Sequence, residues 1–326
     1  MFNSIYVEER ALDYSITQQL LQKYAGCDII YIKHYKDVFN RPNQLFRVQK
    51  QHQALILAVK ENQFIYKGPE VCQDFGHENF YYTSFLLNCI YDCEYCYLQG
   101  MYPSANPVAF VNVEDFRDEI NKTVGNGPAL LAASYDTDLL AFHNIIPYMD
   151  YFYGFFAGKP ELSVEVRTKS AGLAFYQTHT PLDNLMIAFT LSPQEIIRSY
   201  ERHTPSLASR IKAVQAAMEC GFRVRLCFDP VFIHPHQNAL YEPFYEDVFN
   251  QIDAGRVTDV GYGFFRMSPD FFKRIEKQLE YSRLFSDNYC VNRDVVSYPP
   301  DLQEEVKAEH LTLLSKYMKK EKIFSL

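Results

Sequence analysis

Short apolar runs alternate with longer amphipathic stretches from about residue 80 onwards, and this alternation constrains the fold more than any other feature of the chain. The apolar runs have the length and composition of buried strands, and they cover residues 80–87, 128–134, 162–170, 184–192, 222–232 and 259–268. The stretches between them place apolar residues at helical spacing, at residues 113–124, 139–156, 206–221 and 241–252. Strands that alternate with helices in this way form a parallel sheet with crossover helices, so we expect an α/β fold, either a partial barrel or a doubly wound sheet.

The segments on either side of this region have a different character. Residues 1–80 mix short helical and extended pieces, including a helix with Ser15 as its cap and a buried strand at 54–59. Residues 268–326 are charged and largely helical in pattern. We therefore expect an N-terminal α/β segment (1–80) packed on a barrel (81–267), followed by a C-terminal substrate-binding and helical segment (268–326).

The bulk composition argues against several classes of protein. The chain has 326 residues, 48% of them hydrophobic, and no apolar run of about 18 residues, so we expect no membrane span. Its first residues lack the apolar stretch of a secretion signal, so we expect a cytoplasmic protein. The formal net charge of −8 argues against a broadly basic nucleic-acid-binding surface but leaves room for a local basic patch. Eight cysteines in such a chain indicate metal or redox chemistry rather than disulfides.

Three of the cysteines stand close together, directly after the first predicted barrel strand. Cys89, Cys93 and Cys96 have the spacing C-x3-C-x2-C. Three thiolates can hold three irons of a [4Fe–4S] cluster and leave the fourth iron open to a small molecule. The alternatives are a zinc site, with Asp92 or a histidine as the missing fourth ligand, and three structural thiols. We favour the cluster, because zinc knuckles rarely sit at the end of a barrel strand.

This spacing, with an aromatic residue before the last cysteine, resembles the radical SAM superfamily. The longer string Cys96-Tyr97-Leu98-Gln99 is similar to the spore photoproduct lyase family, and the likeness extends over most of residues 81–267. The resemblance implies a partial (β/α)6 TIM-type barrel of the radical SAM kind, with an N-terminal α/β extension and a C-terminal hairpin and helical tail. It also implies that the three cysteines hold a [4Fe–4S] cluster that cleaves S-adenosylmethionine.

The activity implied by the resemblance is DNA repair. A radical SAM carbon–carbon lyase of this family reverts the spore photoproduct, 5-thyminyl-5,6-dihydrothymine, to two thymines in ultraviolet-damaged DNA through a 5′-deoxyadenosyl radical. A reducing partner such as flavodoxin or ferredoxin is implied as well, and we expect a monomer. Two other functions stay open: a related radical SAM enzyme acting on another nucleotide or a small molecule, and an iron–sulfur or zinc protein that binds nucleic acid without catalysis.

Residues at the predicted strand ends carry further parts of the resemblance. The segments Ala133–Asp138, Arg167–Lys169, Phe189–Ser192 and Phe228–His234 are similar to family segments at these places. Carried over position by position, the S-adenosylmethionine site comprises Tyr95, Ser134, Thr137, Lys169, Thr190, Ser192 and Asp229. Barrel active sites lie at the carboxyl ends of the strands, where Lys169 can pair with the methionine carboxylate. For each of the hydroxyl-bearing residues taken alone, the alternative is a structural role at a strand end or as a helix cap.

The resemblance assigns a hydrogen-atom relay to Tyr95 and Tyr97, but the chain departs from the family at the hydrogen donor. Tyr135 stands where the resemblance places a donor cysteine. A thiol suits this step because its S–H bond is weak enough to give hydrogen to a carbon radical. We favour Cys72 as donor, because its segment leads into the first barrel strand and can fold over the active-site mouth, and Tyr135 can join the relay. Cys227 is the alternative donor, and burial as a small apolar residue is the alternative for Cys72.

Basic and aromatic residues interleave late in the chain. By resemblance to the C-terminal hairpin of the family, we expect Arg266, Arg293 and Tyr298 to contact the lesion, with Arg293 replacing an arginine that is missing next to Tyr298. An extruded base needs a pocket and stacking groups, and phosphates need cations. The alternative interpretation is that these charged side chains lie on the solvent-exposed face of a helix and do not contact DNA.

Overall fold

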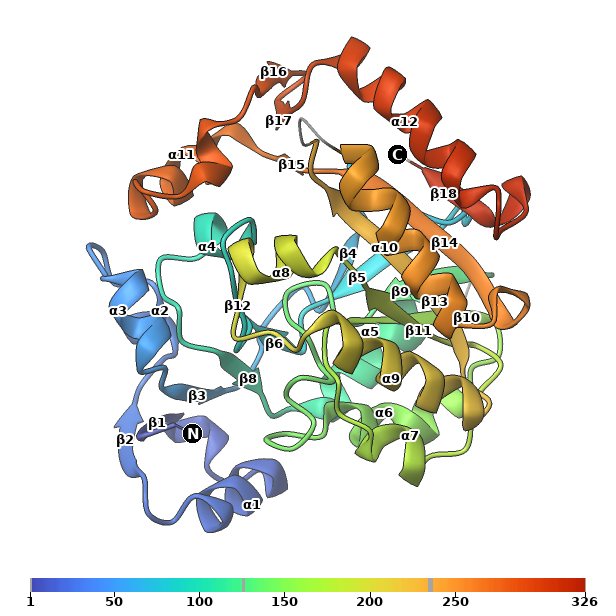
Figure 1. Cartoon of the computed structure of the whole chain (residues 1–326). Helices are drawn as coiled ribbons and strands as arrows, with labels where there is room; N and C mark the ends of the chain where they lie inside the picture. The colour runs from blue at the N-terminus through green and yellow to red at the C-terminus, as the bar shows by residue number, and fades with distance from the viewer. Residues whose placement is uncertain (1, 125–126, 234–236, 326) are drawn as a thin grey trace.

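The computed structural model of the chain describes residues 2–124, 127–233 and 237–325. Figure 1 shows a small sheet near the N-terminus, in blue, and a larger sheet that extends across the rest of the molecule. Within the described ranges, no helix is both long enough and apolar enough to cross a membrane.

The larger sheet has eight strands in the order β18-β14-β13-β11-β10-β9-β5-β4. In this order they are Ile323–Ser325, Val257–Phe264, Arg223–Val231, Leu185–Thr190, Leu162–Thr168, Ala129–Ala132, Phe80–Thr83 and Ile65–Lys67. β4 is antiparallel to β5, whereas the neighbours from β5 to β18 are parallel. From β5 to β14 the strands stand in chain order, so their right-handed crossovers fall on one face, as in a barrel and unlike a doubly wound sheet. The predicted partial (β/α)6 barrel is therefore confirmed.

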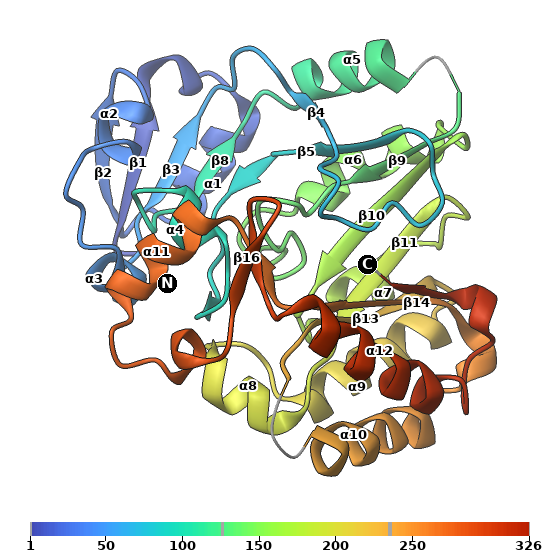
Figure 2. The ribbon, with the colours of Figure 1, turned by 90° about the horizontal axis from the view of Figure 1, so that it is seen from above.

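Helices lie between these strands along the chain and pack around the sheet (Figures 1 and 2). They are α5 (Val113–Val124), α6 (Tyr148–Ala157), α7 (Ala174–Thr178), α8 (Gln194–Tyr200), α9 (Leu207–Glu219) and α10 (Gln237–Gln251). In α9, the Ser206 side chain accepts from the Ser209 N–H at the first turn, and Gly221 follows the last turn with φ 89°. Apolar side chains such as Ile187 and Leu226 are fully buried in the core that these elements share.

The smaller sheet has five strands in the order β2-β1-β3-β8-β6, which are Asp28–Ile32, Ser4–Glu8, Leu55–Ala58, Val108–Phe110 and Leu86–Leu87. The helices α1 (Ser15–Lys23), α2 (Lys36–Phe39) and α3 (Phe46–Gln51) accompany it. Ser15 is the first residue of α1 and not its cap, which is Tyr14. The two sheets interleave along the chain, because β4 joins the larger sheet while β6 and β8 join the smaller one. The division of the chain at residues 80 and 267 stays a prediction.

The C-terminal segment contains the predicted hairpin and helices. β15 (Arg266–Met267), β17 (Val295–Ser297) and β16 (Cys290–Asn292) form a three-stranded sheet, flanked by α11 (Pro269–Gln278) and α12 (Pro300–Leu314) in Figure 1. Arg293 and Asp294, which join β16 to β17, have φ values of 46° and 62°, as a two-residue turn of the favoured type requires. β18 then returns to the edge of the larger sheet, so this segment completes the fold.

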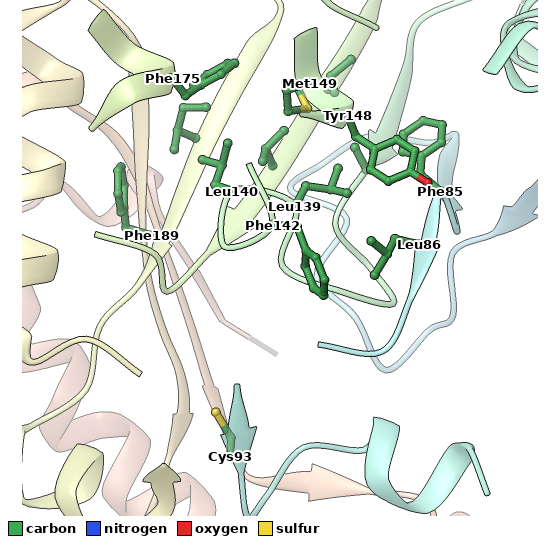
Figure 3. Packing of buried hydrophobic residues seen from close by; sticks show 14 of the residues in the cluster. Phe85, Leu86, Cys93, Leu139, Leu140, Phe142, Tyr148, Met149, Phe175 and Phe189 are labelled. Atoms are coloured by element: carbon green, nitrogen blue, oxygen red, sulfur yellow. The ribbon is translucent and has the colours of Figure 1, made fainter. Parts of the chain in front are cut away.

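One predicted helix is shorter than expected. The helix predicted over 139–156 begins at Tyr148, with Pro147 directly before it. Apolar residues of the preceding loop are buried in the same cluster as Phe85 (Figure 3), namely Leu139, Leu140 and Phe142. Their apolar character therefore reflects burial in the core, and Pro147, whose ring is tolerated only near a helix start, fixes where the helix begins.

Candidate active site

A cavity of about 400 Å³ opens at the carboxyl ends of the barrel strands, a size typical of sites that bind small molecules and cofactors. Its walls come from the ends of β9, β10, β11 and β13, from the loop before β5, from the cysteine loop and from the segment between β14 and α11. The predicted site residues that line it are Cys72, Cys89, Cys93, Tyr95, Cys96, Tyr97, Ser134, Tyr135, Thr137, Lys169, Thr190, Asp229 and Arg266. The structure thus brings most of the predicted site together.

The cysteine loop is held by side chains that lie outside it. Asn88 precedes Cys89 with φ 67°, a left-handed conformation that asparagine tolerates better than most residues. Its side-chain amide donates to the carbonyl oxygens of Ser104 and Asn106 at 2.7 and 2.9 Å. Lys50 Nζ donates to the carbonyl oxygen of Cys89 at 2.6 Å. These contacts fix the course of the loop through parts of the protein that surround it.

Asp92, the suggested fourth zinc ligand, has a different role. With Cys93 it forms β7 (Asp92–Cys93), which pairs with β12 (Glu201–Arg202) in antiparallel orientation. The two terminal nitrogens of Arg47 donate to the two carboxylate oxygens of Asp92, at 2.6 and 2.8 Å, so both oxygens are already bound. In the part of the chain that the structure describes, no group of three or more His, Cys, Asp or Glu side chains is arranged to hold a single metal ion. The zinc interpretation therefore loses Asp92 as its fourth ligand.

The three thiols fit an iron–sulfur cluster better than a single ion. The irons of a cubane occupy separate corners, so its thiolates stand farther apart than the ligands of one ion. All three thiols line the same cavity, and burial raises the pKa of each of them. Cluster binding must therefore release their protons, and the nearby Lys50 and Lys169 ammonium groups favour the thiolate of Cys96. Three thiols that border one cavity fit the donor set that a [4Fe–4S] cluster with one free iron needs.

Lys169 and Tyr95 lie together beside this loop. Lys169 Nζ is 5.4 Å from the centroid of the Tyr95 ring, within cation–π distance. The Tyr95 hydroxyl donates to Glu201, which is fully buried and ion-paired with Arg210. Burial raises the pKa of Glu201, but Lys169 and Arg210 outweigh this effect and hold that pKa below its usual value, so the carboxylate stays ionised. The Tyr95 hydroxyl is thus bound to Glu201, and its part in the relay that the resemblance implies stays a prediction.

Two hydroxyls in the cavity wall lack partners. Ser134 Oγ and Thr137 Oγ1 are buried and make no hydrogen bond within the described residues. A buried hydroxyl without a partner costs about 1–3 kcal/mol, so these groups favour a polar ligand in the cavity. Nearby, Asp138 accepts from Thr168 Oγ1 and from the Lys169 N–H, both at 2.7 Å, and so fixes the end of β10. The sequence pattern did not predict this role for Asp138, although the residue closes the segment that contains both hydroxyls.

Cys72 lies in the cavity wall beside Tyr135. Its Sγ is 3.7 Å from the Tyr135 hydroxyl oxygen. The Tyr97 hydroxyl donates to the main-chain oxygen of Tyr135 at 2.6 Å, and the centroids of these two rings are 5.8 Å apart. Burial raises the pKa of the Cys72 thiol, so the thiol keeps its hydrogen at neutral pH. Cys227, the alternative donor, is fully buried within β13 and outside the cavity lining.

Two of the predicted site residues pair with each other. Arg266 Nη1 and Nη2 donate to Oδ1 and Oδ2 of Asp229, at 2.9 and 3.0 Å. Burial acts to raise the pKa of Asp229, but Arg266 and then Arg167 outweigh it and hold the pKa below its usual value. Asp229, expected at S-adenosylmethionine, and Arg266, expected at DNA, therefore form an ion pair inside the protein.

The remaining predicted residues lie outside the cavity lining. Ser192 is buried and donates to Glu201 at 3.4 Å. Tyr298 is 1% exposed and donates its hydroxyl to Asp287 at 3.0 Å, so it belongs to the core next to β17 and not to a surface that receives a base. Each hydroxyl is thus bound within the protein, and the contacts predicted for Ser192 with S-adenosylmethionine and for Tyr298 with the lesion stay predictions. Arg293 is exposed at the tip of the hairpin, where its contact with DNA stays a prediction.

Solved structures share this fold over the whole chain. A spore photoproduct lyase complexed with dinucleoside spore photoproduct has a TM-score of 0.86 and 16% identity, covering 100% of this chain and 98% of its own. A mutant of spore photoproduct lyase with bound AdoMet and dinucleoside spore photoproduct has a TM-score of 0.84 and 17% identity over the same shares.

Sequence comparisons identify the family. Spore photoproduct lyase of Bacillus subtilis is 24% identical over 78% of this chain and 74% of its own length. The spore photoproduct lyase of Clostridium acetobutylicum is 23% identical over 74% and 72%. A family model described as spore photoproduct lyase matches residues 1–288, and on that match the chain belongs to the spore photoproduct lyase family.

Proposed function

We propose that this protein is a radical SAM carbon–carbon lyase that reverts the spore photoproduct in ultraviolet-damaged DNA to two thymines. One observation carries the proposal: three closely spaced cysteines, two unpaired hydroxyls and a further thiol, Cys72, border a single cavity. The solved relatives support the choice of substrate, since they include complexes with the dinucleoside spore photoproduct.

The cofactors would be held by residues of the cavity wall. The three cysteines provide the thiolates for a [4Fe–4S] cluster and leave one iron for S-adenosylmethionine. When bound, these groups supply a 5′-deoxyadenosyl radical that removes a hydrogen atom from the lesion. Lys169 offers a cation for the methionine carboxylate, and Ser134 and Thr137 offer their unpaired hydroxyls to that carboxylate or to the ribose. A carrier of single electrons, flavodoxin or ferredoxin, would reduce the cluster of a monomeric, cytoplasmic enzyme.

Cys72 provides the hydrogen that quenches the product. Its thiol gives a hydrogen atom to the thymine carbon radical, so that a C–H bond forms, the S–H bond breaks and a thiyl radical is left. The Tyr135 hydroxyl, 3.7 Å from the sulfur, restores the S–H bond with its own hydrogen atom. Tyr97, packed on Tyr135, would extend this relay by giving its hydrogen atom to the Tyr135 oxygen and regaining one from 5′-deoxyadenosine. That hydrogen is the one first removed from the lesion, so the unpaired electron would return to the 5′-deoxyadenosyl carbon and a turnover would consume no net hydrogen.

The proposal is tested on the reconstituted wild-type protein. We expect about four irons per chain, as a [4Fe–4S] cluster requires. With dithionite and S-adenosylmethionine the protein should form 5′-deoxyadenosine, and it should convert a synthetic dinucleotide photoproduct to two thymines. Formation of 5′-deoxyadenosine without repair would instead identify a related enzyme with another nucleotide or small-molecule substrate. Protein that binds nucleic acid but neither iron nor S-adenosylmethionine would overturn the enzyme assignment.

Removing the Thr137 hydroxyl should weaken the binding of S-adenosylmethionine. Thr137→Val keeps the shape of the side chain, and loss of one hydrogen bond should raise the KM for S-adenosylmethionine about threefold to tenfold. The control is Thr312→Val on α12, whose hydroxyl donates to the Ala308 carbonyl oxygen on the exposed face of the helix. An unchanged KM, together with a gain in stability from removing an unpaired hydroxyl, would show that Thr137 does not contact the cofactor.

A further inference from the structure

Cys72 lies on an irregular segment, residues 68–79, which we call the strap. It joins β4 to β5, and at its base the Gly68 N–H donates to the Phe80 carbonyl oxygen at 2.7 Å. Within it, hydrogen bonds close short turns, as from the Cys72 N–H to the Pro69 carbonyl oxygen at 3.0 Å. Figure 2 shows this connection passing over the larger sheet near β10. The turns fix the shape of the strap, but contacts with the barrel must set its place at the cavity.

Arg266 binds the main chain of the strap at the residue directly before Cys72. Its Nε donates to the carbonyl oxygen of Val71 at 2.8 Å. The same guanidinium binds both carboxylate oxygens of Asp229, and its Nη1 also donates to the Phe264 carbonyl oxygen at 2.9 Å. A guanidinium is planar and rigid, so fixing it on Asp229 also fixes the direction of Nε. The strap is thereby tied to the ends of β13 and β14 one residue before the donor thiol.

A second anchor lies on the other side of Cys72. The centroid of the Phe75 ring is 3.1 Å from the guanidinium carbon of Arg225, and the ring meets Phe324 edge-on at 5.3 Å. Arg225 is held in turn by the carboxylate of Asp259, at 2.8 Å from its Nη2. Two guanidinium groups, each fixed by a carboxylate of the barrel, therefore bracket the thiol.

We propose that Arg266 is a positioning residue for the hydrogen donor, holding the strap so that the Cys72 thiol faces the cavity next to the Tyr135 hydroxyl. This inference rests on the proposed function, in which Cys72 donates hydrogen. It replaces the lesion contact expected from the sequence, because the Arg266 guanidinium already makes four hydrogen bonds within the protein. Asp229 acts with it by holding the guanidinium in place.

Arg266→Lys is the decisive variant. Lysine keeps a charge for Asp229 but, as a point charge without the planar fork, cannot hold the carboxylate and the Val71 carbonyl together. We expect the ratio of net 5′-deoxyadenosine to restored thymine to rise about tenfold, because the displaced thiol quenches the product poorly and the hydrogen removed from the lesion is then not taken back by the relay. Arg256→Lys is the matched control, since Arg256 also donates to a carbonyl oxygen, that of Met218, but precedes β14 at the opposite end of the barrel.

A second measurement does not need repair activity. The rate at which iodoacetamide alkylates Cys72, measured by mass spectrometry relative to the exposed Cys220, should rise several-fold in Arg266→Lys and stay unchanged in Arg256→Lys. If the wild type repairs nothing, the proposed function fails, and the alkylation rates still decide whether Arg266 holds the strap. Unchanged alkylation in Arg266→Lys would overturn the inference. A wild-type ratio of products with weaker, less salt-sensitive binding of long oligonucleotides would overturn it as well, in favour of a DNA contact.

Discussion

Cys72→Ala should lower the rate of photoproduct repair about 100-fold or more, equivalent to at least about 2.7 kcal/mol of activation free energy, while 5′-deoxyadenosine continues to form. The reason is geometric: apart from the three cysteines of the motif, Cys72 is the cysteine among the described residues that lines the cavity. The radical formed on the product then has no thiol to quench it. The measurement is chromatography of restored thymine and of 5′-deoxyadenosine from the same reaction.

The isotope content of the product provides an independent check. In D2O the Cys72 thiol exchanges its hydrogen, so the wild type should place deuterium in the restored thymine, and any residual product of Cys72→Ala should contain less. Cys220→Ala is the control, because Cys220 is an exposed free cysteine at the end of α9. Repair by Cys72→Ala at the wild-type rate, with the same deuterium content, would contradict the assignment and turn attention to Tyr135.

The position of the site could be predicted from the sequence because the carboxyl ends of parallel strands meet at one edge of a barrel. Ser134, Lys169 and Thr190 are far apart in the chain, yet each lies within the last three residues of a predicted strand, and all three line the cavity. The placement of Cys72 followed from similar reasoning, since a segment that leads into the first strand starts near that edge. Local sequence patterns are thus sufficient to predict the position of a residue where that position is set by geometry common to the whole fold class.

The partners of individual side chains could not be predicted in this way. Asp229 stands at a strand end, as expected, but an arginine on a later strand binds it, and no local pattern contains that pairing. Tyr298 has the composition of a stacking residue, but burial and the Asp287 carboxylate place it in the core. Such outcomes depend on which distant groups the folded chain brings within hydrogen-bond distance. A motif can therefore predict where a residue lies more readily than whether its polar atoms are free.

Replacing Glu201 should have the largest effect on stability. Glu201 and Arg210 are an ion pair with no exposed side-chain surface. Glu201→Ala leaves the Arg210 charge buried without its partner, which should lower the free energy of unfolding by about 3–5 kcal/mol. The Tyr95 and Ser192 hydroxyls lose their acceptor at the same time. The change in the free energy of unfolding is measured from the midpoint and slope of urea unfolding curves. Using the cluster-free protein excludes any contribution from iron binding.

A double variant separates the charge from the shape of the side chain. Combining Glu201→Met with Arg210→Met removes both charges, and apolar replacement of a buried ion pair is often tolerated. The free energy of unfolding of this double variant should therefore be at least about 2 kcal/mol higher than that of Glu201→Met alone. Glu242→Ala, which breaks an exposed pair with Lys316, should leave the midpoint nearly unchanged. Equal instability of the single and double variants would show that the hydroxyls bound to Glu201 matter more than the charge of Arg210.

The same pair should also affect the cysteine loop, because β12, which contains Glu201, pairs with β7, which contains Cys93. After reconstitution, the Glu201→Ala variant should therefore retain less iron than the Glu242→Ala variant.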